Sequence, residues 1–152
     1  WVYSPFNKNF LITILNLQKK FFKDNLPLKV VHDQIGSPTN TFGLANVCWL
    51  LLQQIESGEI SQKIFHWSDR GQISWYEFAN EISLLGKEMG ILEEKVDILK
   101  INASDFKADA IRPSYSVLDC SNTENSLKIK QKNWDIELRK VMNELKNGTF
   151  KN

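Results

Sequence analysis

The sequence has little cysteine and no long apolar run. Its two cysteines, Cys48 and Cys120, lie outside any Cys-x-x-Cys or Cys/His cluster, and we interpret both as reduced, half-buried packing residues. The longest apolar run, residues 47–52, is far shorter than the roughly 20 residues that a membrane helix needs. We therefore expect a soluble, cytoplasmic protein with no membrane partner.

The sequence also lacks an excess of charge of either sign. Lysine and arginine total 19 against 18 aspartate and glutamate residues, which leaves a net charge of +1. No patch of basic residues interleaved with exposed aromatics stands out, so the electrostatic footprint of a nucleic-acid-binding protein is missing and no nucleic-acid partner is expected. The 152 residues, 42% of them hydrophobic, suffice for one compact domain.

Motifs of self-sufficient catalysis are missing as well. The sequence contains no Gly-x-Gly-x-x-Gly loop, no Gly-x-Ser-x-Gly elbow and no phosphate-binding Gly-Lys-Ser/Thr segment. His32 and His66 have no partner at metal-ligand spacing, and the paired acids Glu93 and Glu94 lie in a charged stretch where solvation is the usual outcome. We therefore predict neither a metal site nor an acid/base pair here.

What the sequence does contain is a regular alternation of apolar patterns. Strands are expected at residues 1–4, 28–31, 64–67 and 96–101. Helices are expected after the caps Asn9 and Thr41, after the capping box that Ser74 forms with Glu77, and from Trp134 until Gly148. The alternation predicts an α/β fold of helices with a few short strands, too few for a complete doubly wound sheet.

The second of these helices has a predicted buried side. Its apolar residues recur at helical spacing, and Gly58 follows as a left-handed cap. The residues expected to face the core are Leu44, Val47, Cys48, Leu51 and Ile55.

Candidate ligand-binding residues lie in three loops at strand ends, where α/β proteins build their sites: residues 1–9, 33–39 and 112–116. Arg112 precedes a proline and so projects from an extended backbone, which suits a bidentate phosphate contact and a surface salt bridge equally well. Gln34 and Asn9 offer directional hydrogen bonds, and Trp1 offers a flat apolar face, although core packing would also account for it.

Four segments in order resemble the dTDP-4-dehydrorhamnose reductases, members of the extended short-chain dehydrogenase/reductase superfamily. They are Trp1-Val2-Tyr3 with Asn9-Phe10, Asp33-Gln34-Ile35-Gly36-Ser37-Pro38-Thr39, Ser74-Trp75-Tyr76-Glu77-Phe78-Ala79, and Arg112-Pro113-Ser114-Tyr115-Ser116-Val117-Leu118-Asp119. The resemblance covers nearly the whole chain. It implies a Rossmann-type fold and the reduction of a dTDP-4-dehydro-L-rhamnose substrate by NADPH or NADH.

The resemblance also implies roles for particular residues. Trp1 would pack near the deoxysugar and the nicotinamide, with Tyr3 as a second candidate for a cofactor contact. Asn9 and Phe10 would lie near the nucleotide, and Gln34 and Arg112 would reach the nucleotide or the diphosphate. The family's glycine-rich loop and Tyr-x-x-x-Lys pair precede its Trp-Val-Tyr segment, so no catalytic residue is expected in this chain.

We therefore expect residues 1–152 to be a single carboxyl-terminal, substrate-binding domain, cut from something longer and without the dinucleotide-binding half. The expected partners are a dTDP-sugar and either a second copy of the chain or the missing half. Phe42 stands where some relatives carry a carboxylate of a metal-assisted dimer, so no metal-bridged dimer is expected. The alternatives are a non-catalytic regulatory relative and, less well matched in motif spacing, a nucleotide-sugar epimerase or dehydratase.

Overall fold

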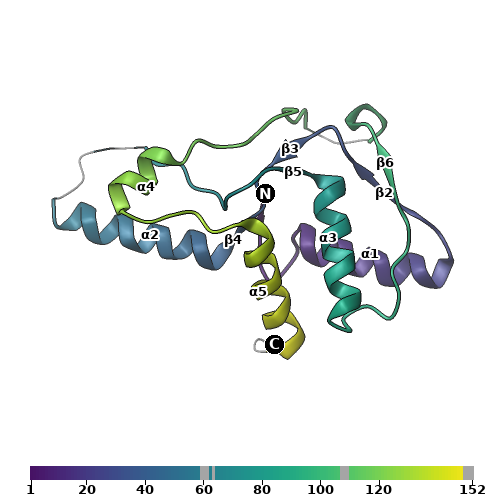
Figure 1. Ribbon diagram of the computed structural model, residues 1–152. Helices are drawn as coiled ribbons and strands as arrows, with labels where there is room; N and C mark the ends of the chain where they lie inside the picture. Colours follow the sequence, from purple (N-terminus) through teal and green to yellow (C-terminus); the bar gives the residue numbers. More distant parts are fainter. Residues whose placement is uncertain (59–61, 63, 107–109, 149–152) are drawn as a thin grey trace.

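The computed structural model describes residues 1–58, 62, 64–106 and 110–148, and its helices and short strands alternate as the sequence predicts (Figure 1). The strands are β1 (Val2–Tyr3), β2 (Leu28–Val31), β3 (Ile35–Gly36), β4 (Thr39–Asn40), β5 (Ile73–Ser74) and β6 (Ile98–Ile101). The helices are α1 (Phe10–Asp24), α2 (Thr41–Glu56), α3 (Trp75–Glu88), α4 (Ser121–Leu127) and α5 (Trp134–Asn147), with one 3₁₀ turn, η1 (Ala103–Asp105). No described helix is both long and apolar enough to cross a membrane.

The described strands form three separate pairs instead of one sheet. β1 and β4 are parallel, as are β2 and β6, whereas β3 and β5 are antiparallel. The longest pair, β2 with β6, runs in register from Leu28 opposite Ile98 to Val31 opposite Ile101. Parallel strands are normally covered on both faces, and here the helices supply that cover only in part.

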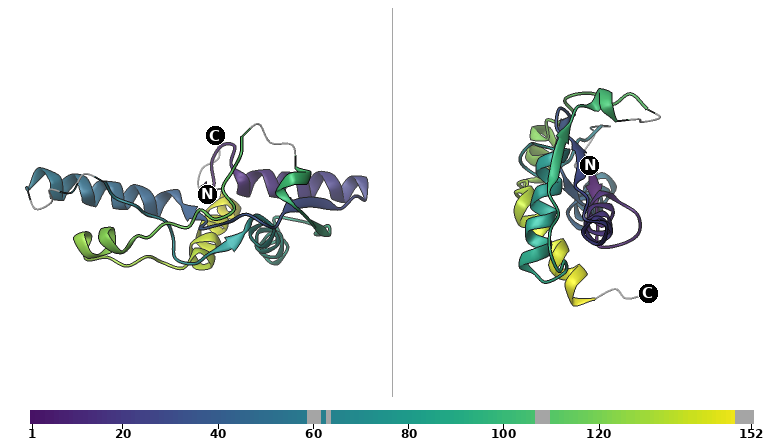
Figure 2. Two further views of the ribbon diagram at one scale, coloured as in Figure 1. Left: turned by 90° about the horizontal axis from the view of Figure 1, so that it is seen from above. Right: turned by 90° about the vertical axis from the view of Figure 1, so that its right-hand side faces the viewer.

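The core lies where α3 packs between α1 and α5, below the strands in the view of Figure 1 (Figures 1 and 2). Each helix contributes one apolar stripe, and each fully buried leucine, isoleucine or phenylalanine stabilises the fold by about 1.5–3 kcal/mol. The residues with the least exposed side chains in this core include Tyr3, Leu11, Phe78, Ile82, Leu138, Val141 and Met142.

Local capping sets where the helices begin. Asn9 is the N-cap of α1, and its side chain accepts a hydrogen bond from Ile12 N, as predicted. The predicted capping box at α3 is also present, because Glu77 N donates to Ser74 Oγ while Ser74 N donates to Glu77 Oε2. These interactions need only neighbouring residues, which is why the sequence predicts them.

Two local predictions are wrong. Asn40, not Thr41, is the N-cap of α2: its side-chain oxygen accepts a hydrogen bond from Phe42 N at 2.9 Å, and Thr41 is already helical. The described residues from Ile64 to Trp67 form no strand, and Ile64 is 70% exposed. An apolar segment becomes a strand only where a neighbouring backbone can pair with it, and pairing here begins later, at Arg70.

The predicted buried side of α2 is also wrong in this chain. Only Val47 is buried, whereas Cys48 is exposed rather than half-buried and Ile55 is 50% exposed. α2 and α4 lie side by side at one end of the molecule, away from the core (Figures 1 and 2). No described segment covers the outer apolar face of α2. The apolar residues therefore recur at helical spacing, as predicted, but most of them are not buried.

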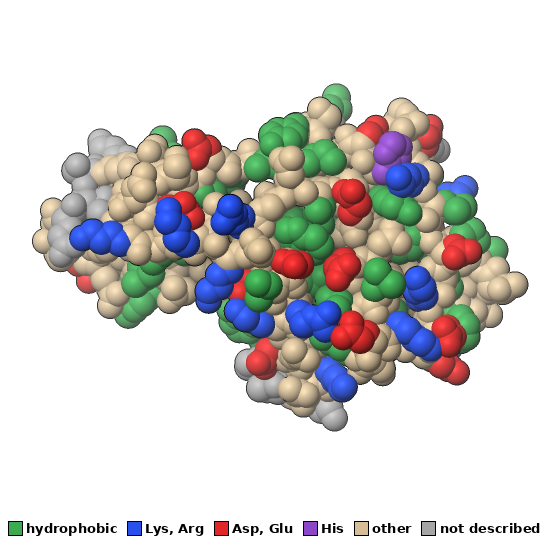
Figure 3. All heavy atoms as spheres, viewed as in Figure 1, with side chains coloured by type: hydrophobic (Ala, Val, Ile, Leu, Met, Phe, Trp, Pro, Cys, Tyr) green, Lys and Arg blue, Asp and Glu red, His purple; other side chains and the backbone are tan. Residues whose placement is uncertain are grey.

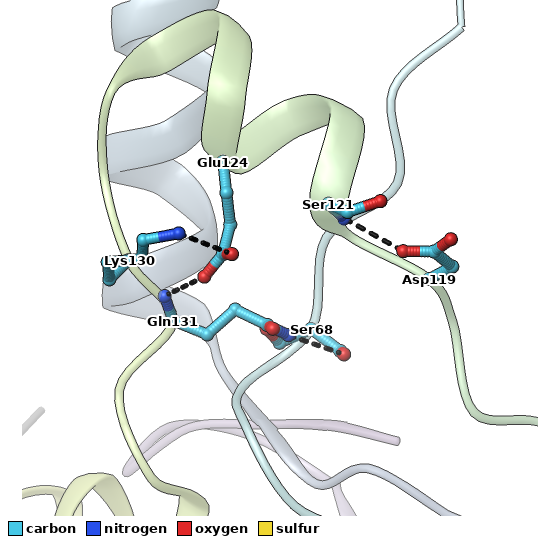
Figure 4. A network of polar contacts seen from close by, with 6 residues as sticks. All are labelled: Ser68, Asp119, Ser121, Glu124, Lys130 and Gln131. Atoms are coloured by element: carbon cyan, nitrogen blue, oxygen red, sulfur yellow. Dashed lines mark hydrogen bonds and ion pairs between the residues drawn. The ribbon is translucent and has the colours of Figure 1, made fainter.

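A polar network holds α4 in place (Figure 4). Glu124 accepts hydrogen bonds from Lys130 Nζ at 3.1 Å and from Gln131 N at 2.8 Å. Gln131 in turn donates to Ser68 O at 2.8 Å. These contacts tie α4 to the irregular segment that precedes β5.

Candidate functional site

A cavity of about 610 Å³ opens between α1, β2 and the segment around Arg112. Most of its lining is apolar and comes from four separate parts of the chain. The apolar lining residues include Phe10, Ile14, Leu17, Leu28, Val30, Val31, Trp75, Phe106 and Ile111. The polar ones are Thr13, Lys29, Gln34, Ser104 and Arg112. A mostly apolar cavity with a few convergent polar groups is the usual form of a small-molecule site.

Three of the five predicted substrate-binding residues line this cavity: Phe10, Gln34 and Arg112. Gln34 and Arg112 meet because a short bridge pairs their segments: Ile35 N donates to Ser114 O at 2.8 Å, and Ser116 N donates to Ile35 O at 2.9 Å. The bridge begins two residues after Arg112 and one after Gln34, so it fixes both backbones at one rim.

A second set of contacts fixes the residues just before Gln34 to another part of the cavity lining. Asp33 Oδ1 accepts a hydrogen bond from Ala103 N at 2.8 Å, and His32 Nε2 lies 3.1 Å from Asn102 Oδ1. Ala103 and Ser104, which line the cavity, are thereby held to the end of β2. The sequence places Asp33 in a candidate ligand-binding loop but does not reveal this hydrogen bond, because the partner is 70 residues away.

The charge of the cavity is one-sided. Lys29 and Arg112 contribute two cations, and the residues that line it include no aspartate or glutamate. Within the described part of the chain, neither cation forms a salt bridge. Two unpaired cations beside an apolar surface favour an anionic ligand with an apolar portion, such as a nucleotide.

Trp1 lies one layer behind this cavity instead of lining it. Its indole stacks on that of Trp75, with ring centroids 3.5 Å apart and planes 6° from parallel. It also packs on Gly36, where an added Cβ would lie 2.3 Å from Trp1 Cε2. Trp75 does line the cavity, so it connects Trp1 with the cavity-lining Phe10.

Asn9 and Tyr3 are not among the residues that line the cavity, and both support the structure around it. The Asn9 amide caps α1 and also donates to Ser4 O at 3.0 Å and Phe6 O at 2.9 Å. The Tyr3 side chain is 1% exposed and packs edge-on against Phe78. A nucleotide contact by Asn9 and a cofactor contact by Trp1 or Tyr3 therefore stay predictions.

A second cavity, of about 600 Å³, lies beside the start of α2 and contains a buried polar cluster. Asp69 Oδ2 accepts a hydrogen bond from Asn40 N at 2.8 Å, and the Asn40 amide donates to Glu137 Oε2 at 2.9 Å. Burial raises the pKa of Asp69 to about 6, with a further contribution from Glu137. Burial opposes ionisation of Glu137 too, but hydrogen bonds from Lys140 and Asn40 outweigh it and lower the pKa of Glu137.

This second cavity is electrically mixed, unlike the first. Lys130, Lys132 and Lys140 line it together with the carboxylates. Figure 3 shows several lysine and arginine side chains near the segment that follows α4. Burial raises the pKa of the Tyr3 phenol well above its usual range, and the negative charges of Asp69 and Glu137 raise it further. The cluster thus has the character of a structural network.

Solved structures with the same fold are known. A dTDP-4-dehydrorhamnose reductase from Clostridium acetobutylicum ATCC 824 aligns with a TM-score of 0.76 and 32% identity, over 95% of this chain and 46% of that one. A dTDP-4-dehydrorhamnose reductase from Bacillus anthracis str. Ames, solved in complex with NADP, aligns with a TM-score of 0.72 and 28% identity, over 95% and 45%. The fold is therefore the Rossmann-type α/β fold of the extended short-chain dehydrogenases/reductases.

Sequence relatives identify the family within that class. Residues 1–147 match the family described as RmlD substrate binding domain. The chain is 30% identical to a dTDP-4-dehydrorhamnose reductase of Aggregatibacter actinomycetemcomitans, over 93% of its own length and 47% of the relative. The spore coat polysaccharide biosynthesis protein SpsK of Bacillus subtilis (strain 168) is 34% identical over 95% and 45%. The chain belongs to the RmlD substrate binding domain family, and it spans about half the length of these relatives.

Proposed function

We propose that residues 1–152 are the substrate-binding, carboxyl-terminal portion of a dTDP-4-dehydrorhamnose reductase. The full-length protein would reduce the 4-keto group of dTDP-4-dehydro-L-rhamnose to give dTDP-L-rhamnose, a nucleotide sugar for polysaccharide synthesis. The observation that carries the proposal is the cavity that joins Phe10, Gln34 and Arg112, with two cations that form no salt bridge among the described residues beside an apolar wall. The two free cysteines agree with a reducing, cytoplasmic location.

Each cavity residue has a role in this proposal. The apolar wall that includes Phe10 receives the base, and Arg112 binds the diphosphate through its planar pair of donors. Gln34 supplies a directional hydrogen bond to the nucleotide, while Asn9 fixes the start of α1 and hence Phe10. Trp1 does not line the cavity, so in this proposal the deoxysugar extends beyond the cavity to the part of the Trp1 indole that stays exposed.

The chain's own contribution to the reaction is binding and orientation. NADPH or NADH supplies the hydride, bound mainly by an amino-terminal half that the relatives carry and this chain lacks. The proton donor also belongs to that half, so the chain alone is expected to be inactive. Holding the keto carbon in a fixed orientation is itself a large part of catalysis, because binding then supplies the loss of translational and rotational entropy that the reaction needs.

The test is turnover by the full-length protein in the presence of NADPH. We expect oxidation of NADPH with dTDP-4-dehydro-L-rhamnose and little with uridine-linked sugars. Tight binding of dTDP without any turnover would instead favour the regulatory relative. Interconversion of sugar epimers without net NADPH consumption would favour an epimerase.

A further inference from the structure

The start of α3 is the one motif of the four that the proposed function leaves without a role. Trp75 is its first helical residue, and Ser74 before it is fixed twice, by the capping box with Glu77 and by pairing with Ile35 in β3. The backbone of Trp75 is therefore held at the junction between α3 and the segment that carries Gln34. A capping box alone would not require an indole at this position.

The Trp75 indole has two different aromatic neighbours. On Trp1 it stacks almost in parallel at 3.5 Å between centroids, and it meets the ring of Phe10 at 4.5 Å and 43°. Phe10 lines the cavity, whereas Trp1 does not. Trp75 thus contacts both the cavity wall, at Phe10, and the Trp1 indole, and so fixes the position of one relative to the other.

The Trp1 indole packs against the core, and two of its neighbours, Gly36 and Trp75, bear on its orientation. Its backbone is fixed to β4, since Thr39 N donates to Trp1 O at 2.9 Å. Its ring, however, is placed by Gly36, which leaves room for it, and by the stack on Trp75. A side chain without a flat face at position 75 would leave the Trp1 ring without the stacked surface that sets its plane.

We propose that Trp75 is a positioning residue of the substrate site, which sets the plane of Trp1 relative to Phe10 and so aligns the sugar of a nucleotide sugar with its nucleotide. This inference rests on the proposed function, in which Trp1 contacts the deoxysugar and Phe10 the base. Trp75 also lines the cavity beside Phe10, but the role proposed for it is to orient Trp1, so it is a positioning residue and not a catalytic one.

The test is a double-mutant cycle in the full-length protein, with kcat/KM for dTDP-4-dehydro-L-rhamnose and the dissociation constant of dTDP-L-rhamnose as readouts. We expect Trp75→Leu to lower kcat/KM by about 100-fold, the loss typical of a misplacement on the order of 1 Å. In a Trp1→Ala background the same change should cost only about twofold, because its route of action is gone. Trp75→Phe should restore most of the activity.

A matched control is Trp134→Leu, because Trp134 meets Phe78 edge-on but lies outside the cavity. We expect it to lower stability with much less effect on kcat/KM. Additive losses of Trp1 and Trp75, or an equal loss for Trp134→Leu, would overturn the inference while leaving the proposed function standing. A wild-type protein that neither reduces nor binds these nucleotide sugars would overturn both.

Discussion

At the scale of single residues, Arg112 carries the sharpest chemical expectation. It lines the cavity without a salt bridge among the described residues, and Pro113 keeps its backbone extended. We expect Arg112→Ala to raise KM for the nucleotide sugar about 10- to 100-fold, the loss of a charged bidentate contact, with little change in KM for NADPH. Steady-state kinetics of the full-length protein would measure both constants.

The matched variant is Arg112→Lys, which keeps the charge but not the planar pair of donors. It should recover part of the lost affinity. Equal effects of Arg112→Ala on both Michaelis constants would remove Arg112 from the substrate site and leave it as a surface residue.

Asp69 predicts a dependence of stability on pH. Burial raises its pKa from 3.8 to about 6, so the native state holds this proton more tightly than the unfolded chain does. The resulting stabilisation is complete below about pH 4 and is lost as the pH rises through 6. Asp69→Asn still accepts the Asn40 hydrogen bond without ionising.

We therefore expect the free energy of unfolding of Asp69→Asn, relative to wild type, to rise by about 1–2 kcal/mol between pH 4 and pH 7. Urea unfolding of the chain at several pH values would measure this difference. Because the comparison is between two variants, the titration of Glu137 and other groups largely cancels. Parallel pH curves for the two proteins would contradict the account of Asp69.

At the scale of elements, Gln18 connects α1 with the segment leading to β6. It is the one polar residue in the apolar stripe of α1 and is fully buried. Its side chain accepts from Val96 N at 2.7 Å and donates to Val96 O at 3.4 Å. The sequence shows Gln18 only as an exception to a pattern, since nothing nearby in sequence reveals a partner 78 residues away.

We expect Gln18→Leu to destabilise the chain by about 2 kcal/mol, because it leaves the amide and carbonyl of Val96 without partners. Asn16→Leu, an exposed position on the same helix, should change stability by no more than about 0.5 kcal/mol. Urea unfolding of both variants gives the comparison. A neutral effect of Gln18→Leu would mean that water replaces the lost hydrogen bonds.

Elements were predictable to the extent that their causes are local. The α1 cap at Asn9 and the box between Ser74 and Glu77 involve residues three apart, and the apolar stripes of α1, α3 and α5 follow from spacing alone. The apolar stripe of α2 and the apolar segment 64–67 misled because burial and strand pairing depend on what lies opposite. The two-residue strands β3, β4 and β5 were not predicted for the same reason, because each exists only through its pairing with a distant segment.

Some residues of the candidate site could be predicted from the sequence, and others could not. Gln34 and Arg112 were found from loops at strand ends, and Phe10 and Trp1 from the family resemblance. Three residues contribute to the cavity only through tertiary contacts: Lys29, Asp33 and Trp75. In sequence they are an exposed strand residue, a turn residue and the first residue of a helix, and none of these positions by itself distinguishes the residue from others of its kind. Side chains that shape a site from behind are the hardest to recognise without a structure.

At the scale of the whole molecule, the outer face of α2 has consequences for assembly. A groove of about 500 Å³ is lined by Thr41, Leu44, Ala45, Cys48, Trp49 and Leu52. Trp49 is 59% exposed and Leu52 46%. Such apolar surface favours association, either with a second copy or with the amino-terminal half that the relatives carry.

We expect the 152-residue chain to self-associate in sedimentation velocity, and a Trp49→Lys, Leu52→Lys variant to shift toward the monomer. Ile136→Lys is the control, since Ile136 is 51% exposed on α5, away from this groove. Association should weaken when the amino-terminal half is supplied in the same polypeptide. A stable, monodisperse monomer of the wild-type chain would count against an interface on α2.

We propose that this chain holds the nucleotide sugar while another half supplies hydride and proton. The most direct test is NADPH oxidation with dTDP-4-dehydro-L-rhamnose, measured in parallel on the chain and on the full-length protein. We expect activity in the full-length protein alone, and its loss in Arg112→Ala at substrate concentrations near the wild-type KM. Activity of the isolated chain would rule out this division, because the catalytic groups would then lie within residues 1–152.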